Sequence, residues 1–174
     1  MSDVRPHKVK DIFVEGAIPP SFIAESIAKH STRTDIGAHE IFLGQVRGDS
    51  FVVSHPEPSR RTNHDPKNTL RQVHHDSRVT AIEYTTYREM AMERMTTLRE
   101  EAFTRWPTMT CLHVHHSLGT IKAGELCFMV FASAPHRQQA REAVAWVVDA
   151  IKSELPIFGK EVLSGGDHLW KSNS

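Results

Sequence analysis

The stretch that decides the fold is ELCFMVFASAPHRQQAREAVAWVVDAIKSELPIFGK, residues 125–160. Its first part, from Leu126 to Ala132, is a continuous apolar run rich in strand-forming residues, which is typical of a strand covered on both faces. Ser133 is a candidate helix cap, and Pro135 suits the first turn of a helix. Apolar residues then recur at helical spacing before Pro156 ends the helix, namely Ala140, Val144, Val147, Val148, Ile151 and Leu155. The sequence therefore predicts a strand, a helix and a short return segment.

His136 and Arg137 fall in the first turn of this expected helix and lean toward its apolar stripe, near the edge of the sheet. Free backbone N–H groups and the positive helix end favour an anion there, and an arginine adds a two-pronged phosphate donor. Since the helix dipole contributes only about 0.3–1 kcal/mol, the two side chains would supply most of the affinity. The open alternative is a surface helix that simply begins with polar residues.

Two lysines lie at the other end of the helix. Lys152 stands at the margin of the apolar stripe, and Lys160 follows the turn formed by residues 155–159. Two ammonium groups close together, or one that is partly desolvated, lower a lysine pKa from about 10.4 toward the 7–8 that is useful in catalysis. Both are therefore candidate catalytic groups, although each taken singly also fits a solvated surface charge.

Arg47 is a third candidate, because it ends a strand that Gly37 is expected to open and that runs through residues 41–43. An arginine at a strand end beside two glycines is well placed to reach an anion. An ion pair between Arg47 and Asp49 is equally open.

Residues 50–78 are rich in Pro, His, Arg, Asn and Asp with little periodicity, which predicts a long mobile loop and leaves a flexible cover over the site as one role. The loop holds His55, His64, His74 and His75, but it has no cysteine and no helical histidine spacing, so solvated histidines are favoured over a metal site.

A strand over residues 79–87, a helix over 88–105 and a strand over 110–118 are expected next. His113 and His115 fall on one face of the last strand and His116 on the other. Because the sequence identifies no third ligand, we expect no metal.

The chain has 174 residues, 39% hydrophobic content and a formal net charge of zero. These values predict one domain over residues 1–174 and argue against a general nucleic-acid or membrane surface. No apolar run could span a bilayer and no signal peptide is recognisable, so the cytoplasm is the expected location. Cys111 and Cys127 are expected to be reduced, buried thiols. The order of elements predicts an α+β domain with helices packed on a mixed, largely antiparallel sheet.

Five tracts carry a resemblance to a known family: FLGQVRGD at 42–49, EYTTYREMA at 83–91, SLGTIKAGE at 117–125, SAPHRQQAREA at 133–143 and KSELPIFGKE at 152–161. In order and spacing, over most of residues 36–171, they resemble the large, catalytic subunit of molybdopterin synthase, the MoaE family. The resemblance implies an α/β hammerhead arrangement, a homodimer at the centre of a heterotetramer, and a small ubiquitin-like sulfur-carrier subunit at each end.

The same resemblance implies a reaction, in which sulfur passes from the C-terminal Gly-Gly thiocarboxylate of the carrier to cyclic pyranopterin monophosphate and forms the dithiolene of molybdopterin. It implies that Arg47, His136 and Arg137 bind the substrate, with the pocket completed across a dimer interface, and that Lys152 and Lys160 meet the thiocarboxylate. No metal and no cofactor is required.

The sequence departs from the family at one point. The family commonly has a lysine directly after the aromatic residue of the Pro-x-aromatic turn, whereas this chain has Gly159 followed by Lys160. Whether Lys160 replaces the family lysine stays open, as does the role of Trp170, which suits partner docking or core packing equally. A non-catalytic carrier-binding homologue that retains the fold is the main alternative, ahead of a histidine-rich metal hydrolase and a plain phosphate-binding protein.

Overall fold

A computed structural model describes the backbone of residues 10–56 and 72–170 and the side chains of residues 10–50 and 77–170. The elements, in chain order, are β1 (Phe13–Glu15), α1 (Ser21–Ala28), β2 (Ala38–Gln45), β3 (Ser50–Pro56), β4 (Gln72–Thr86), α2 (Arg88–Arg105), β5 (Cys111–Lys122), β6 (Leu126–Ala134), α3 (Arg137–Glu154), β7 (Ile157–Leu163) and β8 (His168–Trp170).

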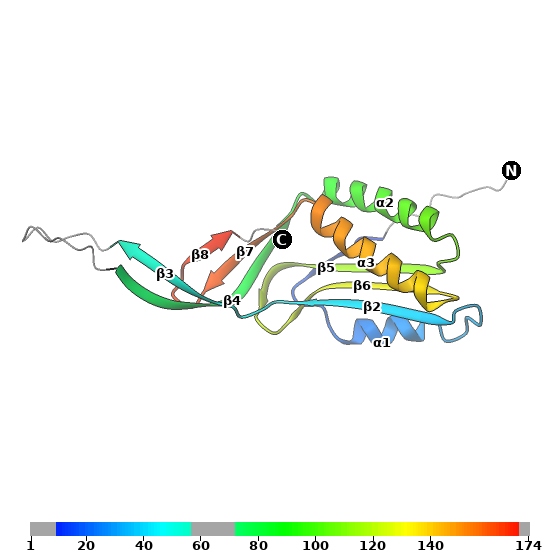
Figure 1. Cartoon of the computed structure of the whole chain (residues 1–174), viewed down its shortest axis with the longest axis horizontal. Helices are drawn as coiled ribbons and strands as arrows, with labels where there is room; N and C mark the ends of the chain where they lie inside the picture. Colours follow the sequence, from blue (N-terminus) through cyan, green and yellow to red (C-terminus); the bar gives the residue numbers. More distant parts are fainter. Residues whose placement is uncertain (1–9, 57–71, 171–174) are drawn as a thin grey trace, which may run out of the picture.

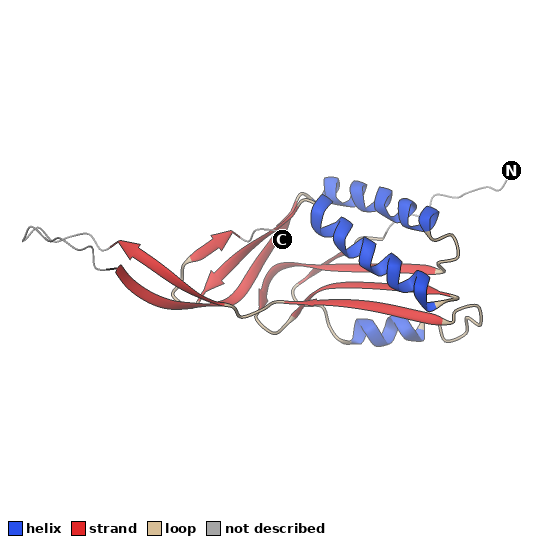
Figure 2. Cartoon of the chain, in the orientation of Figure 1, coloured by secondary structure: helices blue, strands red, loops and turns tan. Residues whose placement is uncertain are grey.

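The strands form one sheet in the order β2-β6-β5-β4-β7-β8, with β1 beside β5 and β3 beside β4. The described pairs are antiparallel except for β1 and β5, which run parallel. This confirms the expected α+β class with a mixed, largely antiparallel sheet. Helices α2 and α3 cover one face of β2, β6 and β5, and α1 covers the other, while the long β4 carries β3, β7 and β8 away from this helical body (Figures 1 and 2).

The core lies between α3 and the sheet, as the apolar stripe of the helix predicts. Helix α3 contributes seven buried residues, Ala140, Ala143, Val144, Val147, Val148, Ala150 and Ile151, and β6 contributes a run from Cys127 to Ala132 that is buried throughout. Each fully buried Val, Ile or Phe side chain contributes about 1.5–3 kcal/mol relative to an exposed one. Helix α3 ends at Glu154, directly before Leu155 and Pro156, in agreement with the sequence.

Ser133 does not cap α3, which corrects the expectation. The edge strand β2 extends the ladder, with His39 opposite Ser133 and Ala38 opposite Ala134, so β6 continues to Ala134 and Ser133 is fully buried. His136 occupies the N-cap position instead, in an extended conformation and without a side-chain cap.

Residues 50–78 also differ from the expected loop, because residues 50–56 and 72–78 pair as the antiparallel strands β3 and β4. The β-forming run Phe51-Val52-Val53 accounts for this, since it outweighs the turn-forming composition that follows it in the sequence. Residues 57–71, and with them the question of mobility, lie outside the described residues.

The strand expected over residues 110–118 is longer than predicted. Strand β5 runs on to Lys122, pairing with β6 over residues 111–116 and with β4 over residues 119–122. Gly119 has a φ of 79°, a conformation that residues with a side chain rarely adopt, and it lets one strand bend between two partners. Among the described residues, none of the helices has the length and apolar character that crossing a membrane requires.

Candidate active site

A pocket of about 540 Å³ lies where the ends of β2 and α3 meet β4, β5 and β7. We call it the lysine pocket, and the residues on its wall that matter here are Arg47, Tyr84, His116, Cys127, Lys152 and Gly159. Arg47 and Lys152 are far apart in the sequence. They reach one cavity because helix α3 packs against strand β2 of the sheet.

The two cations of this pocket stand at its rim. Lys152 is exposed in the last turn of α3. The side chain of Arg47 is 77% exposed, and its Nη2 lies 3.1 Å from a carboxylate oxygen of Asp49. The ion pair that the sequence left open is therefore present. Exposed pairs of this kind contribute only about 0–1 kcal/mol, so an anionic ligand can compete with Asp49 for the guanidinium.

The floor of the lysine pocket is uncharged near neutral pH. Tyr84 donates a hydrogen bond from its hydroxyl to Cys127 Sγ at 3.5 Å, and burial, with a smaller effect of Cys127, raises the pKa of Tyr84 above its ordinary value. Burial lowers the pKa of His116 to about 4. The His116 ring packs against the rings of Tyr84 and Phe128, with centroids 5.1 Å and 5.3 Å away. Charge in the described part of the pocket is therefore concentrated at the rim.

Lys160 is not part of the pocket wall. In the sheet, Lys160 lies opposite Glu83 on β4 and Trp170 on β8, whereas Gly159 lies opposite Tyr84. Since directly opposed residues share a face of the sheet and neighbours along a strand alternate, Gly159 faces the pocket and Lys160 lies on the other face. Trp170 is 72% exposed rather than packed in the core.

His136 and Arg137 belong to a second, larger hollow of about 1160 Å³, which we call the helix-start pocket. It lies between the beginning of α3 and β2, and both side chains are exposed in it. Arg141, one helical turn farther on, also lines it, together with the carboxylates of Glu40 and Glu142. The first turn of α3 has no side-chain cap, so its N–H groups are available to an anion.

The five predicted site residues thus divide into three groups within one chain. Arg47 and Lys152 share the lysine pocket, His136 and Arg137 share the helix-start pocket, and Lys160 lies outside both. Sequence reasoning missed the floor formed by Tyr84, His116 and Cys127. The alternation of residues along β4, β5 and β6 was the available signal, but it needed the pairing of these strands to become useful.

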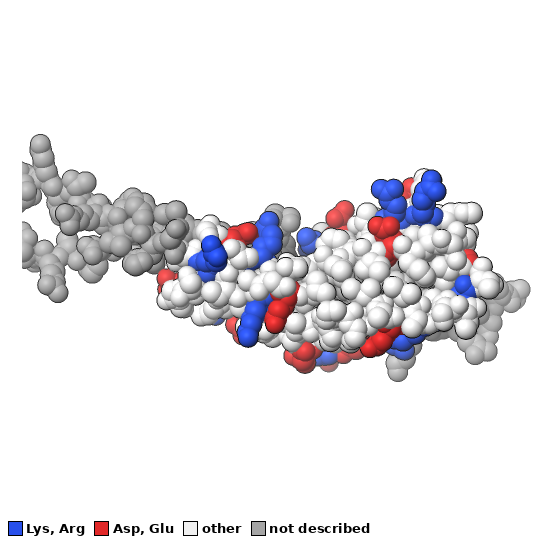
Figure 3. Space-filling view, turned by 90° about the horizontal axis from the view of Figure 1, so that it is seen from below, with Lys and Arg blue, Asp and Glu red and all other residues white. Residues whose placement is uncertain are grey.

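The surface carries no single sign of charge on the face drawn in Figure 3, where blue and red side chains are interspersed over a mostly white surface. On that face, among the residues coloured, there is no continuous basic surface of the kind that nucleic-acid binding uses.

The chain is similar to known proteins in both sequence and fold. A family model described as MoaE protein matches residues 67–154. The molybdopterin synthase catalytic subunit of Culex quinquefasciatus is 34% identical over 107 residues, which is 60% of this chain and 68% of that protein. The corresponding protein of Drosophila willistoni is 35% identical over 106 residues, or 60% of this chain and 28% of that protein. The chain therefore matches less than a third of the length of the Drosophila relative.

Solved structures agree in fold. Molybdopterin synthase from Staphylococcus aureus superimposes with a TM-score of 0.68 at 20% identity, covering 94% of this chain and 98% of that one. A complex of subunits 1 and 2 of molybdopterin-converting factor from Helicobacter pylori gives a TM-score of 0.65 at 14% identity, covering 92% and 88%. The match of the family model to half of the sequence and the extent of the Culex alignment show that this chain belongs to the MoaE protein family.

Proposed function

We propose that this chain is the catalytic subunit of a molybdopterin synthase. It would transfer sulfur from the thiocarboxylated C-terminus of a small ubiquitin-like carrier to cyclic pyranopterin monophosphate, forming the molybdopterin dithiolene. The observation that carries the proposal is the meeting of Arg47 and Lys152 at the rim of one pocket in a member of the MoaE family. The catalytic subunits named among its relatives support it. The cytoplasm remains the proposed location.

Lys152 is the proposed catalytic group. Once the carrier's sulfur has bonded to the substrate, water that adds to the carrier's carbonyl carbon would build negative charge on the carbonyl oxygen, and an ammonium group beside that oxygen stabilises the charge. Collapse of this adduct breaks the carbon–sulfur bond, leaves the sulfur on the substrate and leaves a carboxylate on the carrier. The uncharged floor of Tyr84, His116 and Cys127 strengthens this effect, because an attraction between charges is larger where the surroundings are poorly polarisable.

Arg47, His136 and Arg137 are the proposed phosphate-binding groups. Along α3, the rise of the helix separates Arg137 from Lys152 by about 22 Å. One substrate molecule does not bridge that distance between two pockets of the same chain. We therefore propose that the active chain is a homodimer in which the helix-start pocket of one protomer supplies His136 and Arg137 to the lysine pocket of its partner.

Lys160 keeps a proposed role in catalysis only if the carrier or the partner protomer reshapes the sheet near it. Gly159, at the position where the family commonly has lysine, faces the pocket and offers no amine. Lys152 would then be the one lysine that acts from the described wall of the pocket, and Lys160 would contribute less.

The carrier subunit needs a docking surface near the lysine pocket. Tyr87, Met90 and Phe158 are large apolar side chains with exposures of 66%, 60% and 43%, and the Tyr87 and Phe158 rings are 5.7 Å apart. Among the described residues, β8 pairs only with residues 160–162 of β7, so residues 157–159 have a free edge beside this patch. We propose that the carrier packs on the patch and that its extended C-terminal tail passes along this edge into the pocket. The two-subunit complex of the Helicobacter protein supports a partnership of this kind.

The test combines purified chain, thiocarboxylated carrier and cyclic pyranopterin monophosphate, with dithiolene product measured over time. We expect Lys152→Ala to lower the rate by about 10²–10⁴-fold while carrier binding is retained. Lys160→Ala should stay within about tenfold of the wild type, since its position lies outside the pocket wall. Lys122→Ala, an exposed lysine outside both pockets, is the matched control. A folded wild-type chain that binds carrier but makes no product would instead support the non-catalytic carrier-binding homologue.

A further inference from the structure

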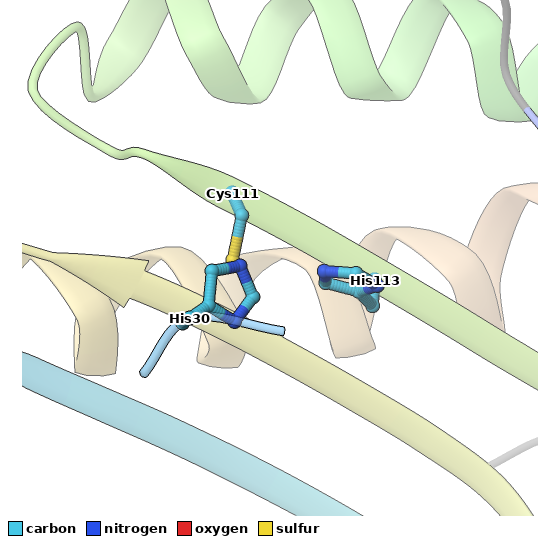
Figure 4. Close-up of side chains that lie close together, drawn as sticks. All are labelled: His30, Cys111 and His113. Carbon is cyan, nitrogen blue, oxygen red and sulfur yellow. The ribbon is translucent and has the colours of Figure 1, made fainter. Parts of the chain in front are cut away.

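Three side chains that can bind a metal ion meet on the face of the sheet that α1 covers. His30 follows the end of α1, while Cys111 and His113 are two residues apart on β5 and so lie on the same face of that strand (Figure 4). Their ligand atoms all lie within 4.8 Å of one another. We propose that His30, Cys111 and His113 form a binding site for a zinc-class transition-metal ion.

The His30 ring is held in the form that a metal requires. Its Nδ1 lies 2.6 Å from the backbone carbonyl oxygen of Ser26, and a carbonyl oxygen only accepts, so Nδ1 carries the hydrogen. In the neutral ring this leaves the lone pair on Nε2. Metal-bound histidines commonly donate their other ring nitrogen to a carbonyl or carboxylate in this way, which fixes the ring's orientation.

The thiol of Cys111 also has a partner that suits a metal ligand. Ser133 Oγ lies 3.1 Å from Cys111 Sγ and 2.7 Å from His39 Nδ1, and Ser133 is fully buried. With the thiol protonated, the sulfur donates to Ser133. When Cys111 loses its proton, the Ser133 hydroxyl can turn and donate to the thiolate, while His39 donates from Nδ1 to Ser133. The network therefore offers a hydrogen-bond donor to the Cys111 sulfur when it binds a metal.

An aromatic ring closes the inner side of the cluster. Phe131 has no exposed surface, and the rings of His30, His39 and His113 pack against it with centroids 5.7 Å, 5.2 Å and 5.6 Å away. Water is thereby excluded from the Phe131 side of the ligands, which strengthens coordination bonds. Two histidines, one cysteine and a water complete a tetrahedron.

The distances are close to those of a bound site. Zinc at about 2.3 Å from sulfur and 2.0–2.1 Å from nitrogen separates its ligand atoms by about 3.3–3.6 Å. The three ligand atoms lie within 4.8 Å of one another, so side-chain rotations that move each atom by about 1 Å would bring them to that spacing. Binding would convert the thiol and the hydrated ion to a metal thiolate and release one proton to solvent.

The charges nearby help to select the ion. Arg33 and Arg99 lie close enough to Cys111 for their positive charges to oppose an incoming cation. An ion that gains little from a thiolate, such as Mg²⁺ or Ca²⁺, is therefore disfavoured, whereas Zn²⁺ and Co²⁺ form strong bonds to sulfur. The sequence alone predicted no metal because His30, the ligand that joins the cysteine and histidine of β5, is distant in the chain.

The proposed ion would act as a clip rather than in sulfur transfer. It would join the segment after α1 to β5, on the face of the sheet opposite α2 and α3 (Figure 1). The lysine pocket is lined by α3 and by residues on the other face of β5, such as His116. Loss of the metal should therefore change the stability of the chain more than the chemistry of the pocket.

The experiment titrates the full metal-free chain with Co²⁺, whose thiolate complexes absorb in the near ultraviolet, and follows Zn²⁺ by calorimetry and thermal unfolding. We expect one equivalent to bind, the thiolate band to appear, and zinc to raise Tm by several degrees. Cys111→Ser should abolish the band, and His30→Gln and His113→Gln should weaken binding at least about tenfold.

Two controls separate this site from other thiols and imidazoles. Cys127→Ala removes the one other cysteine, and His115→Gln changes the next histidine on the same face of β5. Both should keep the band and the affinity, with folding checked by circular dichroism. The proposal is overturned if no thiolate band forms at one equivalent, if the band survives in Cys111→Ser, or if His30→Gln binds as tightly as His115→Gln. None of these outcomes depends on synthase activity.

Discussion

Mixed dimers offer a direct test of how the site is completed. The perturbation is the co-expression of two differently tagged chains, one with Lys152→Ala and one with Arg137→Ala, followed by purification of dimers that carry both tags. Each homodimer should be nearly inactive, because one lacks the proposed catalytic amine and the other lacks a phosphate-binding group. The mixed dimer distinguishes a site built within one chain from a site shared between two.

Lys152 and Arg137 stand at opposite ends of α3, about 22 Å apart, so they cannot act on one substrate within the same chain. The expected rate then depends on how many sites of a mixed dimer hold both residues. If the site is shared, one of the two sites in a mixed dimer combines an intact Lys152 with an intact Arg137 from its partner, and the other site lacks both. Mixed dimers should then regain about half of the wild-type rate per dimer, and an unsorted equimolar mixture about a quarter. If the site lies within one chain, each site lacks one group and no activity returns.

The assay measures dithiolene formation with saturating carrier, and mass spectrometry confirms that each purified dimer holds both variants. A mixture of homodimers combined just before the assay, without time for exchange, is the control and should stay inactive. Activity of the mixed dimer no greater than that of either homodimer would refute the reasoning that the two pockets are joined across an interface.

Two further predictions concern stability. Burial lowers the pKa of His116 to about 4, so the unfolded chain binds a proton between about pH 6.5 and 4 that the folded chain does not bind. The stabilisation from His116 is thus present above about pH 6.5 and falls on acidification, by about 2 kcal/mol at pH 5. In urea unfolding, His116→Leu should remove this share of the dependence and leave that of His113, whose pKa burial also lowers to about 4. A Cβ at Gly37 would lie 2.2 Å from the carbonyl oxygen of Pro135, so Gly37→Ala should cost about 1–3 kcal/mol and lower Tm. Gly48→Ala, whose Cβ would make only ordinary contacts, is the control, and an equal loss of Tm in both variants would contradict the steric explanation.

The sequence predicted the helical body well because its signals were strong and local. Helix α2 was placed at residues 88–105, as observed, and the apolar stripe of α3 identified the side that packs on the sheet. Strands β3 and β4 were missed over residues 50–56 and 72–78, since composition gave a loop and only pairing between the two segments makes them strands. The extra length of β6, which removed Ser133 from its expected capping role, likewise depends on the distant partner strand β2.

The candidate site was predictable residue by residue but not as an arrangement. Arg47 and Lys152 were chosen as separate anion-binding and catalytic groups, and packing of β2 against α3 puts them in one pocket. Helical rise keeps His136 and Arg137 far from Lys152, a separation that the sequence already contained in the length of α3. The register of β7 against β4, which decides that Gly159 rather than Lys160 faces the pocket, was not readable from one segment alone.

Strand β5 joins the two proposed sites and also keeps them apart. Its residues alternate in burial, so Leu112, Val114 and His116 face the helices α2 and α3 while Cys111 and His113 face α1. A substitution at Cys111 or His113 therefore alters the metal cluster without adding or removing atoms in the lysine pocket. The opposite holds for His116, which belongs to the pocket floor. Since the two groups of side chains lie on opposite faces of the sheet, an ion at Cys111 makes no direct contact with the residues of the lysine pocket. We therefore expect metal binding and sulfur transfer to be independent, with the ion affecting how long the chain stays folded rather than how fast it works.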